Sequence, residues 1–212
     1  MSGRLITVEG LDGAGKTTLV EGLARALRER GQPVEVLREP GGVVLAERLR
    51  TIVKDPDLLV DARAEALLYA AARAQLVAER VRPALANGSW LLLDRFVDSS
   101  LAYQGSGRGL GLEEVRAIND FATGGLKPDR TLLLRIDPAT RQQRLTERDE
   151  APDRIEAAGH AFFDAIAQAY DTLAAAEPER FYVIDAAQER SRVLTAALEG
   201  LQGLSDPAAS AD

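Results

Sequence analysis

Short apolar runs alternate along the chain with longer stretches in which apolar residues recur every three or four positions. The short runs are rich in Leu, Val and Ile, as strands buried on both faces are, and they lie at residues 5–8, 34–37, 90–93, 131–134 and 181–184. The longer stretches predict helices, at about residues 17–30, 46–54, 62–85, 112–121, 140–148, 155–175 and 190–201. Strands that alternate with helices predict an α/β fold, with a five-stranded parallel sheet covered by helices on both faces.

The chain length sets the expected domain organisation. The 212 residues fit one ordinary domain, and no Pro-, Gly- or Ser-rich linker interrupts the interior. We therefore expect residues 1–204 to form a single domain. Residues 205–212 are small, polar and acidic, and we expect this tail to be disordered.

Composition and charge exclude several classes of partner. No apolar run approaches the roughly 20 residues that cross a bilayer, and the N-terminus lacks a basic stretch followed by a long apolar core. We therefore expect a cytoplasmic protein with no membrane partner. The net charge of −7 argues against a nucleic-acid partner, because affinity for the phosphate backbone comes mainly from clustered cations.

The residue types available also limit the kind of metal site. The sequence has no cysteine, which excludes disulfides, iron–sulfur clusters and thiolate zinc sites. His160 is the only histidine and cannot form a metal cluster alone. Any bound metal must therefore have oxygen ligands.

A glycine-rich loop follows the first predicted strand directly and precedes the first predicted helix. Gly10-x-x-x-x-Gly15-Lys16-Thr17 matches the Walker A pattern in the context that this motif requires. Its glycines let consecutive backbone N–H groups point at phosphate oxygens, and the helix N-terminus adds a favourable dipole. We expect this phosphate cradle to bind ATP through Gly10, Leu11, Asp12, Gly13, Ala14, Gly15, Lys16, Thr17 and Thr18, with Lys16 at the β- and γ-phosphates.

Two oxygen-bearing side chains are candidate ligands of Mg²⁺. Thr17 ends the Walker A motif, where a hydroxyl commonly binds the metal. Asp94 follows the apolar run at residues 90–93, so a buried strand would deliver its carboxylate to the same edge of the sheet. The sequence thus predicts Mg²⁺ as the cofactor.

A nucleotide loop alone fits kinases, GTPases and ATP-driven machines, so the second substrate has to be inferred from other residues. The Asn-Lys-x-Asp motif that reads guanine is absent, which disfavours a GTPase. Arg38 follows the second predicted strand, where its planar guanidinium group suits a second phosphate. Tyr69 and Arg73 lie four residues apart on a predicted helix, so a flat ring and a hydrogen-bond donor share one face and could bind a base.

Five segments occur in the order characteristic of bacterial thymidylate kinases, and the chain resembles that family of P-loop nucleoside monophosphate kinases. The segments are Glu9-Gly10-Leu11-Asp12-Gly13-Ala14-Gly15-Lys16-Thr17-Thr18, Arg38-Glu39-Pro40-Gly41-Gly42, Asp94-Arg95-Phe96, Ser99-Ser100-Leu101-Ala102-Tyr103-Gln104-Gly105 and Asp153-Arg154-Ile155-Glu156. The resemblance as a whole covers residues 5 to about 186. The resemblance implies transfer of the γ-phosphate of ATP to dTMP, giving dTDP for dTTP synthesis. It also implies a homodimer.

The same resemblance assigns the phosphate and sugar contacts of dTMP. It implies that Arg38 and Arg95 hold the phosphate, that Asp12 reaches the sugar 3′-hydroxyl, and that Tyr103 crowds the 2′ position and so favours deoxyribose. Residues 185–188 resemble the family's loop on the adenine side of the donor site.

The resemblance also assigns the base contacts. Thymine would lie against Tyr69, and its polar edge would be read by Arg73, Ser100 and Gln104. Two positions depart from the family pattern, because the stacking residue is usually phenylalanine and the position of Ser100 often carries a longer polar side chain.

Phosphoryl transfer needs aligned substrates and positive charge around the moving group. Lys16, Mg²⁺ and Arg95 would supply charge from the sheet side. Members of the resembled family carry a further cation either in the cradle or in a mobile lid, and positions 11–14 are Leu, Asp, Gly and Ala here. We therefore expect a short lid at about residues 141–156 to supply it, with Arg154 and then Arg148 as catalytic candidates.

Two alternatives stay open. The first is a P-loop kinase for another nucleoside monophosphate or for a deoxynucleoside. The second is a non-kinase switch driven by NTP hydrolysis, which would hydrolyse nucleotide with no acceptor present.

Overall fold

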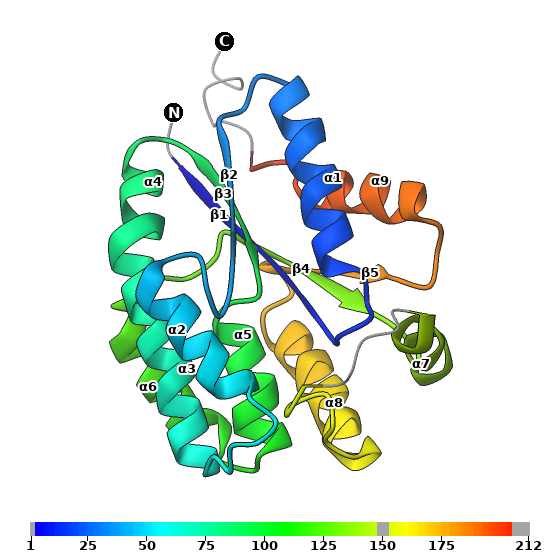
Figure 1. The fold of residues 1–212 in the computed structure, drawn as a ribbon. Helices are drawn as coiled ribbons and strands as arrows, with labels where there is room; N and C mark the ends of the chain where they lie inside the picture. Colours follow the sequence, from blue (N-terminus) through cyan, green and yellow to red (C-terminus); the bar gives the residue numbers. More distant parts are fainter. Residues whose placement is uncertain (1–2, 148–152, 205–212) are drawn as a thin grey trace.

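The computed structural model describes residues 3–147 and 153–204 of the chain. This part contains a five-stranded sheet in the order β2-β3-β1-β4-β5, and all neighbouring strands are parallel (Figure 1). The strands are β1 (Arg4–Gly10), β2 (Val34–Arg38), β3 (Trp90–Asp94), β4 (Arg130–Arg135) and β5 (Phe181–Asp185). The predicted α/β fold with a five-stranded parallel sheet is confirmed.

Helices cover both faces of the sheet. Helices α1 (Lys16–Glu29) and α9 (Arg190–Gly200) lie side by side on one face (Figure 1). The other helices are α2 (Val44–Lys54), α3 (Ala62–Leu76), α4 (Arg82–Ala86), α5 (Val97–Ser100), α6 (Leu112–Thr123), α7 (Pro138–Glu147) and α8 (His160–Ala176). Of these, α3, α4, α5 and α8 pack on the opposite face, and α7 lies near the carboxyl ends of β4 and β5.

Strand β3 shows why its sequence is apolar at consecutive positions. Successive side chains of a strand point to opposite faces of a sheet. Leu92 packs in a buried cluster with Leu23 of α1, whereas Leu91 and Leu93 pack in a second cluster with Leu76 of α3. Both faces of β3 are therefore core, and no polar position remains until the strand ends at Asp94.

The strand register brings the polar ends of β2 and β3 beside β1 at one edge of the sheet. Asp94 of β3 lies beside Val8 of β1 and beside Arg38 of β2. In the spatial order β2-β3-β1-β4-β5, the chain places β2 and β3 on one side of β1 and then β4 and β5 on the other. Such a switch leaves a crevice beyond the carboxyl ends of the strands. The loop after Gly10 occupies this place.

The helix expected over residues 62–85 contains a wider turn. Helix α3 continues through a π-helical turn, η1 (Val77–Val81), into α4. Pro83 explains the change, because proline lacks the backbone N–H of a regular helix and its ring crowds the carbonyl four residues earlier. The π-turn provides the extra space without ending the helix.

Two other segments differ from the helical periodicity. The helix expected from residue 155 begins at His160, after Gly159, and residues 154–157 form turns. Residues 97–107 form α5 followed by a second π-helical segment, η2 (Leu101–Gly107). The expected tail at residues 205–212 lies outside the described residues. Among those described, no helix is long and apolar enough to span a membrane.

Candidate active site

The loop between β1 and α1 has the backbone of a phosphate cradle. Gly10 and Gly15 have φ values of 136° and 92°, in the region that residues with a Cβ rarely adopt. A Cβ on Gly10 would also lie 2.5 Å from the carbonyl oxygen of Leu134 on β4. The glycines that define the motif are thus required by the local geometry.

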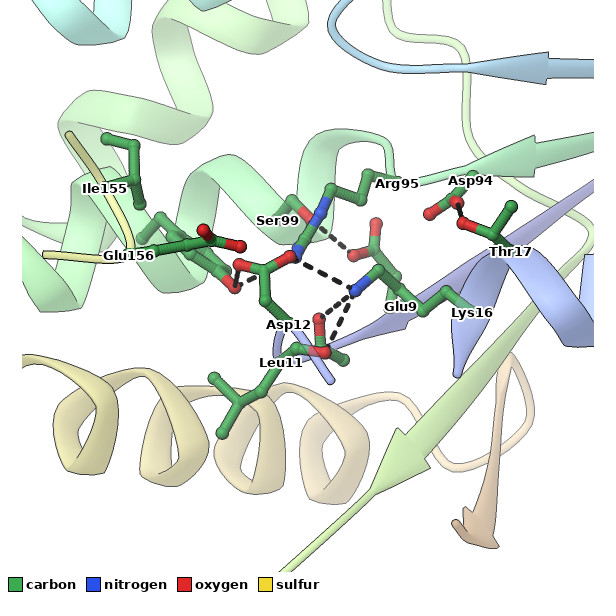
Figure 2. Close-up of polar contacts among 12 residues, drawn as sticks. Glu9, Leu11, Asp12, Lys16, Thr17, Asp94, Arg95, Ser99, Ile155 and Glu156 are labelled. Atoms are coloured by element: carbon green, nitrogen blue, oxygen red, sulfur yellow. Dashed lines mark hydrogen bonds and ion pairs between the residues drawn. The ribbon is translucent and has the colours of Figure 1, made fainter. Parts of the chain in front are cut away.

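Lys16 is folded back over the cradle. Its Nζ donates to the carbonyl oxygens of Gly10 at 3.2 Å and Leu11 at 3.0 Å, and lies 3.7 Å from Asp12 Oδ1 (Figure 2). Burial, and then the nearby Arg95, lower the pKa of Lys16, and Asp12 offsets part of this shift. The ammonium group is therefore held at the loop by polar groups of the cradle itself.

Thr17 and Asp94 meet at the edge of the cradle. The Thr17 hydroxyl donates to Asp94 Oδ2 at 2.9 Å (Figure 2), joining the first turn of α1 to the end of β3. The described residues contain no group of three or more His, Cys, Asp or Glu side chains that could hold a metal ion. A hydroxyl and a carboxylate side by side fit Mg²⁺, which prefers oxygen ligands and usually combines few protein ligands with phosphate oxygens.

Arg95 occupies the centre of the site. Its Nη2 donates to Asp12 Oδ1 at 2.7 Å and to the Tyr103 hydroxyl at 3.0 Å, and its Nη1 donates to Ser99 Oγ at 3.0 Å. Burial alone would raise the pKa of Asp12, but Arg95 and then Lys16 hold that pKa well below its usual range. Asp12 is therefore an ionised acceptor between the cradle and the helices beyond it.

The buried carboxyl group of Glu9 supports the turn that carries Arg95. Glu9 accepts hydrogen bonds from the backbone N–H of Phe96 at 2.7 Å, from Ser99 Oγ at 2.5 Å and from the Tyr170 hydroxyl at 2.9 Å. Burial and the nearby Asp98 raise the pKa of Glu9 to about 7. The sequence pattern assigned Glu9 no role, although an acidic residue within a buried strand was a signal for one.

Arg38 lies at the open side of the site. Its Nη2 is 3.3 Å from Glu47 Oε1, and this carboxylate also accepts the backbone N–H of Gly42 at 2.8 Å. The Arg38 side chain is more than half exposed, so it can exchange Glu47 for another anion.

Arg73 is at the centre of a buried network. It is 2% exposed, and its Nε donates to Glu39 Oε2 at 2.7 Å. Its other nitrogens donate to Ser100 Oγ at 2.9 Å, to the Phe96 carbonyl at 2.9 Å, and to Asn119 Oδ1. The structure thus brings Arg73 and Ser100 together, and each already has a protein partner.

Gln104 shares one buried carboxylate with two arginines. The carboxylate is that of Glu65 on α3, and Gln104 Nε2 donates to its Oε1 at 2.9 Å. Arg108 donates to both Glu65 oxygens at 3.2 Å, and Arg154 Nη2 lies 2.7 Å from Oε2. Nothing in the pattern of helical positions distinguished Glu65 from a surface acid.

Of the two arginines predicted for the lid, Arg148 and Arg154, the structure describes only Arg154. Arg148 lies outside the described residues. Arg154 pairs with Glu65 and donates to the Val53 carbonyl at 3.0 Å, on the α2 and α3 side of the site. A role for Arg154 at the moving phosphate therefore requires it to leave these partners, and this role stays a prediction.

Two other arginines, on α7, contact the cradle. Arg141 Nε donates to the Asp12 carbonyl at 3.1 Å. Arg144 donates to the carbonyls of Gly13 at 3.4 Å and of Ala186 at 2.8 Å, and so links the cradle to residues 185–188. Their spacing of three on a predicted helix was the available signal, and the sequence prediction favoured the arginines beyond them.

Many of these groups line one cavity of about 1340 Å³, whereas its lining does not include Glu9, Glu65, Arg108, Arg141 and Arg154. Most cavities that hold one small ligand measure about 300–1,000 Å³, so this one has room for two substrates. The lining residues come from two regions: Lys16, Thr17 and Arg144 belong to the cradle or contact it, and Arg38, Tyr69, Ser100 and Gln104 come from β2, α3, α5 and η2. Asp12 of the cradle and Arg95, which follows β3, line it as well, and their ion pair joins the two regions.

A Walker A cradle at the reversal point of a parallel sheet, beside an arginine-lined compartment, defines a P-loop protein with the nucleoside monophosphate kinase-like fold. A family model described as "Thymidylate kinase" matches residues 8–196. The chain belongs to the thymidylate kinase family, and the resemblance inferred from its motifs is confirmed.

Individual relatives agree with this assignment. The chain is 49% identical over 208 residues to a thymidylate kinase of Bifidobacterium longum subsp. infantis, covering 96% of this chain and 88% of the relative. It is 50% identical over 184 residues to a thymidylate kinase of Deinococcus radiodurans, covering 87% and 89%. A crystal structure of thymidylate kinase from Ehrlichia chaffeensis has a TM-score of 0.77 at 27% identity, covering 95% of this chain and 99% of that one.

Proposed function

We propose that this chain transfers the γ-phosphoryl group of ATP to dTMP and so forms dTDP. The observation that carries this proposal is the ion pair of Asp12 and Arg95, which joins the Walker A cradle to a second compartment with its own arginines. A kinase needs two such compartments, because donor and acceptor phosphates must meet in line. Membership of the thymidylate kinase family supports dTMP as the acceptor.

On the donor side, the cradle at residues 10–18 would bind the ATP phosphates through its backbone N–H groups. Lys16 would exchange the carbonyls of Gly10 and Leu11 for β- and γ-phosphate oxygens. Thr17 and Asp94 would hold Mg²⁺, which neutralises charge on the phosphates when bound. Arg144 would keep the cradle and residues 185–188 in place around the nucleotide.

On the acceptor side, Arg38 and Arg95 would hold the dTMP phosphate, since a guanidinium group can bind two phosphate oxygens. Asp12 would accept the sugar 3′-hydroxyl, because its carboxylate stays ionised beside Arg95. Tyr103 would crowd the 2′ position from its place beside Asp12 and Arg95.

The thymine compartment would be formed by α3 and η2. Tyr69 lines the cavity one helical turn before Arg73 and offers an aromatic surface for the base. Arg73, Ser100 and Gln104 would read its polar edge; Arg73 and Ser100 are already hydrogen-bonded to each other.

The transfer itself would require no strong general base, because the attacking oxygen of dTMP is anionic near neutral pH. Lys16 and Arg95 would stabilise the moving phosphoryl group from the sheet side. The lid at about residues 141–156 would supply a further cation, with Arg154 first and Arg148 second.

We also propose a cytoplasmic homodimer. Leu45 of α2, Leu67 of α3 and Phe121 of α6 expose 47%, 56% and 92% of their surface. Helix α3 packs against both α2 and α6, so these apolar side chains belong to one helical layer. Burial of an apolar helical layer against a second copy would remove this surface from water.

A substrate panel with ATP and Mg²⁺ tests the function. We expect dTMP to be phosphorylated faster than dCMP, AMP or thymidine. Faster turnover of any of these would favour a P-loop kinase for another acceptor. Hydrolysis of ATP that needs no acceptor and does not change with dTMP would favour an NTP-driven switch.

A further inference from the structure

The Glu65 carboxylate is fully buried, although it lies in the first turn of α3, where acidic residues are usually exposed. Its residue exposure is 0%. Buried carboxylates are costly unless every oxygen is paired. Glu65 meets this condition through Gln104, Arg108 and Arg154, which come from η2, from the residue after η2 and from the turn before α8.

Two arginines pair with Glu65 and make it a hydrogen-bond acceptor. Arg108 forms two parallel hydrogen bonds to it, from Nε to Oε1 and from Nη2 to Oε2, each at 3.2 Å. Arg154 adds a contact of 2.7 Å to Oε2. Paired with two arginines, the oxygens of Glu65 serve as hydrogen-bond acceptors.

Because the Glu65 oxygens are acceptors, they decide which end of the Gln104 amide faces Glu65. Gln104 has one carbonyl oxygen and one NH₂ group, and only the NH₂ group can bond to a carboxylate. The structure has this arrangement, with Nε2 at 2.9 Å from Glu65 Oε1. Gln104 also lines the cavity, so its carbonyl oxygen is the end left for a ligand there.

We propose that Glu65 is a specificity-determining positioning residue, which locks the Gln104 amide so that a hydrogen-bond acceptor faces the base edge. The inference rests on the proposed function, in which Gln104 reads thymine. At ring position N3 thymine carries an N–H donor, whereas cytosine carries a lone pair. A fixed acceptor binds the first and leaves the second unpaired, and buried mismatches of this kind give strong discrimination.

The variant Glu65→Gln reverses the amide. Its single carbonyl oxygen would be claimed by the arginines, which leaves its NH₂ group facing Gln104. Gln104 would then turn its own carbonyl toward residue 65 and present its NH₂ group to the cavity. That end suits N3 of cytosine and opposes N3–H of thymine.

The experiment measures kcat/KM for dTMP and for dCMP in the full-length protein. We expect E65Q to lower the dTMP:dCMP ratio by about tenfold or more. Arg108→Gln is the matched control, because it disturbs the same cluster by one charge but leaves Glu65 to hold Gln104, and we expect it to keep the wild-type ratio. Glu65→Asp retains the charge between the arginines and withdraws it from Gln104, so it should lower the ratio by about threefold.

The outcomes separate the role of Glu65 from the proposed function. Wild-type protein that fails to phosphorylate dTMP would refute the proposed function. Normal wild-type turnover with an unchanged ratio in E65Q, or in E65D where E65Q does not fold, would refute only the role of Glu65. If R108Q lowers the dTMP:dCMP ratio as much as E65Q does, the role of Glu65 is also refuted, because disturbed packing of the cluster would then explain the effect.

Discussion

At the scale of single residues, Arg95 shows how the fold maintains an unfavourable local conformation. Its φ of 71° lies in the left-handed region, at a cost of about 1–3 kcal/mol for a residue with a side chain. The backbone N–H of Arg95 donates to the carbonyl oxygen of Val8, and the backbone N–H of Phe96 donates to Glu9 Oε1. The buried strand β1 thus holds the turn that aims Arg95 at Asp12.

The raised pKa of Glu9 predicts a specific dependence of stability on pH. Its pKa is about 7 in the folded protein, against an ordinary value of 4.5, so between these values the folded state keeps a proton that the unfolded chain has lost. Glu9 therefore contributes less to the free energy of unfolding as pH rises through this window. In denaturant titrations, the wild type should lose about 2–3 kcal/mol relative to Glu9→Gln between pH 5 and pH 8.

Glutamine is close to glutamate in shape and cannot titrate, so the Glu9→Gln variant is the reference for the wild type at each pH. A constant offset between the two proteins across the range would contradict a raised pKa for Glu9. Circular dichroism of both proteins at each pH would confirm that the same folded state is compared.

At the scale of elements, the described residues just before α8 are held by charged contacts to α2 and α3. Lys54 Nζ lies 2.7 Å from Asp153 Oδ2, and Arg154 contacts both the Glu65 carboxylate and the Val53 carbonyl. Helix α7 contacts the cradle instead, through Arg141 and Arg144. The two ends of the expected lid therefore contact opposite compartments, so movement of the lid would change contacts in both.

The lid assignment predicts a loss of turnover when its arginines are removed one at a time. We expect kcat to fall in Arg154→Ala and in Arg148→Ala, by less than the roughly 10³–10⁵ attributed to a single arginine finger, because several arginines share the charge. Steady-state kinetics at saturating ATP and dTMP would measure this. Arg135→Ala is a suitable control, because Arg135 forms an exposed pair with Asp171 away from the cavity lining. If kcat is unchanged in both lid variants, the assignment is wrong.

The elements also show which features the sequence could predict. The strands and the cradle depend on local patterns, and a buried strand such as β3 has the same apolar run whatever surrounds it. The π-turn before Pro83 could not be placed, since a proline can end, bend or widen a helix, depending on packing. Glu65 was not distinguished either, because its three partners come from segments about 40 to 90 residues away.

At the scale of the whole molecule, the layer of α2, α3 and α6 is the surface on which we propose that a second copy packs. We expect the wild type to elute and scatter light as a dimer, and Leu67→Asp to shift it toward monomer, because a buried unpaired carboxylate is costly at an interface. Size-exclusion chromatography with light scattering over a range of concentrations would measure this. A wild type that stays monomeric at all concentrations would contradict the proposed dimer.

The row in which Asp94 lies between Val8 and Arg38 sets the spacing between the strand that leads into the cradle and the strand that carries Arg38. Parallel strands repeat about every 4.8 Å, so β1 and β2 are about 10 Å apart across β3. The end of β1 leads into the cradle, and β2 ends at Arg38, which we propose to hold the acceptor phosphate. Backbone hydrogen bonds therefore fix the separation between the cradle strand and the backbone of Arg38, so side-chain changes elsewhere can alter which acceptor fits while this separation stays the same.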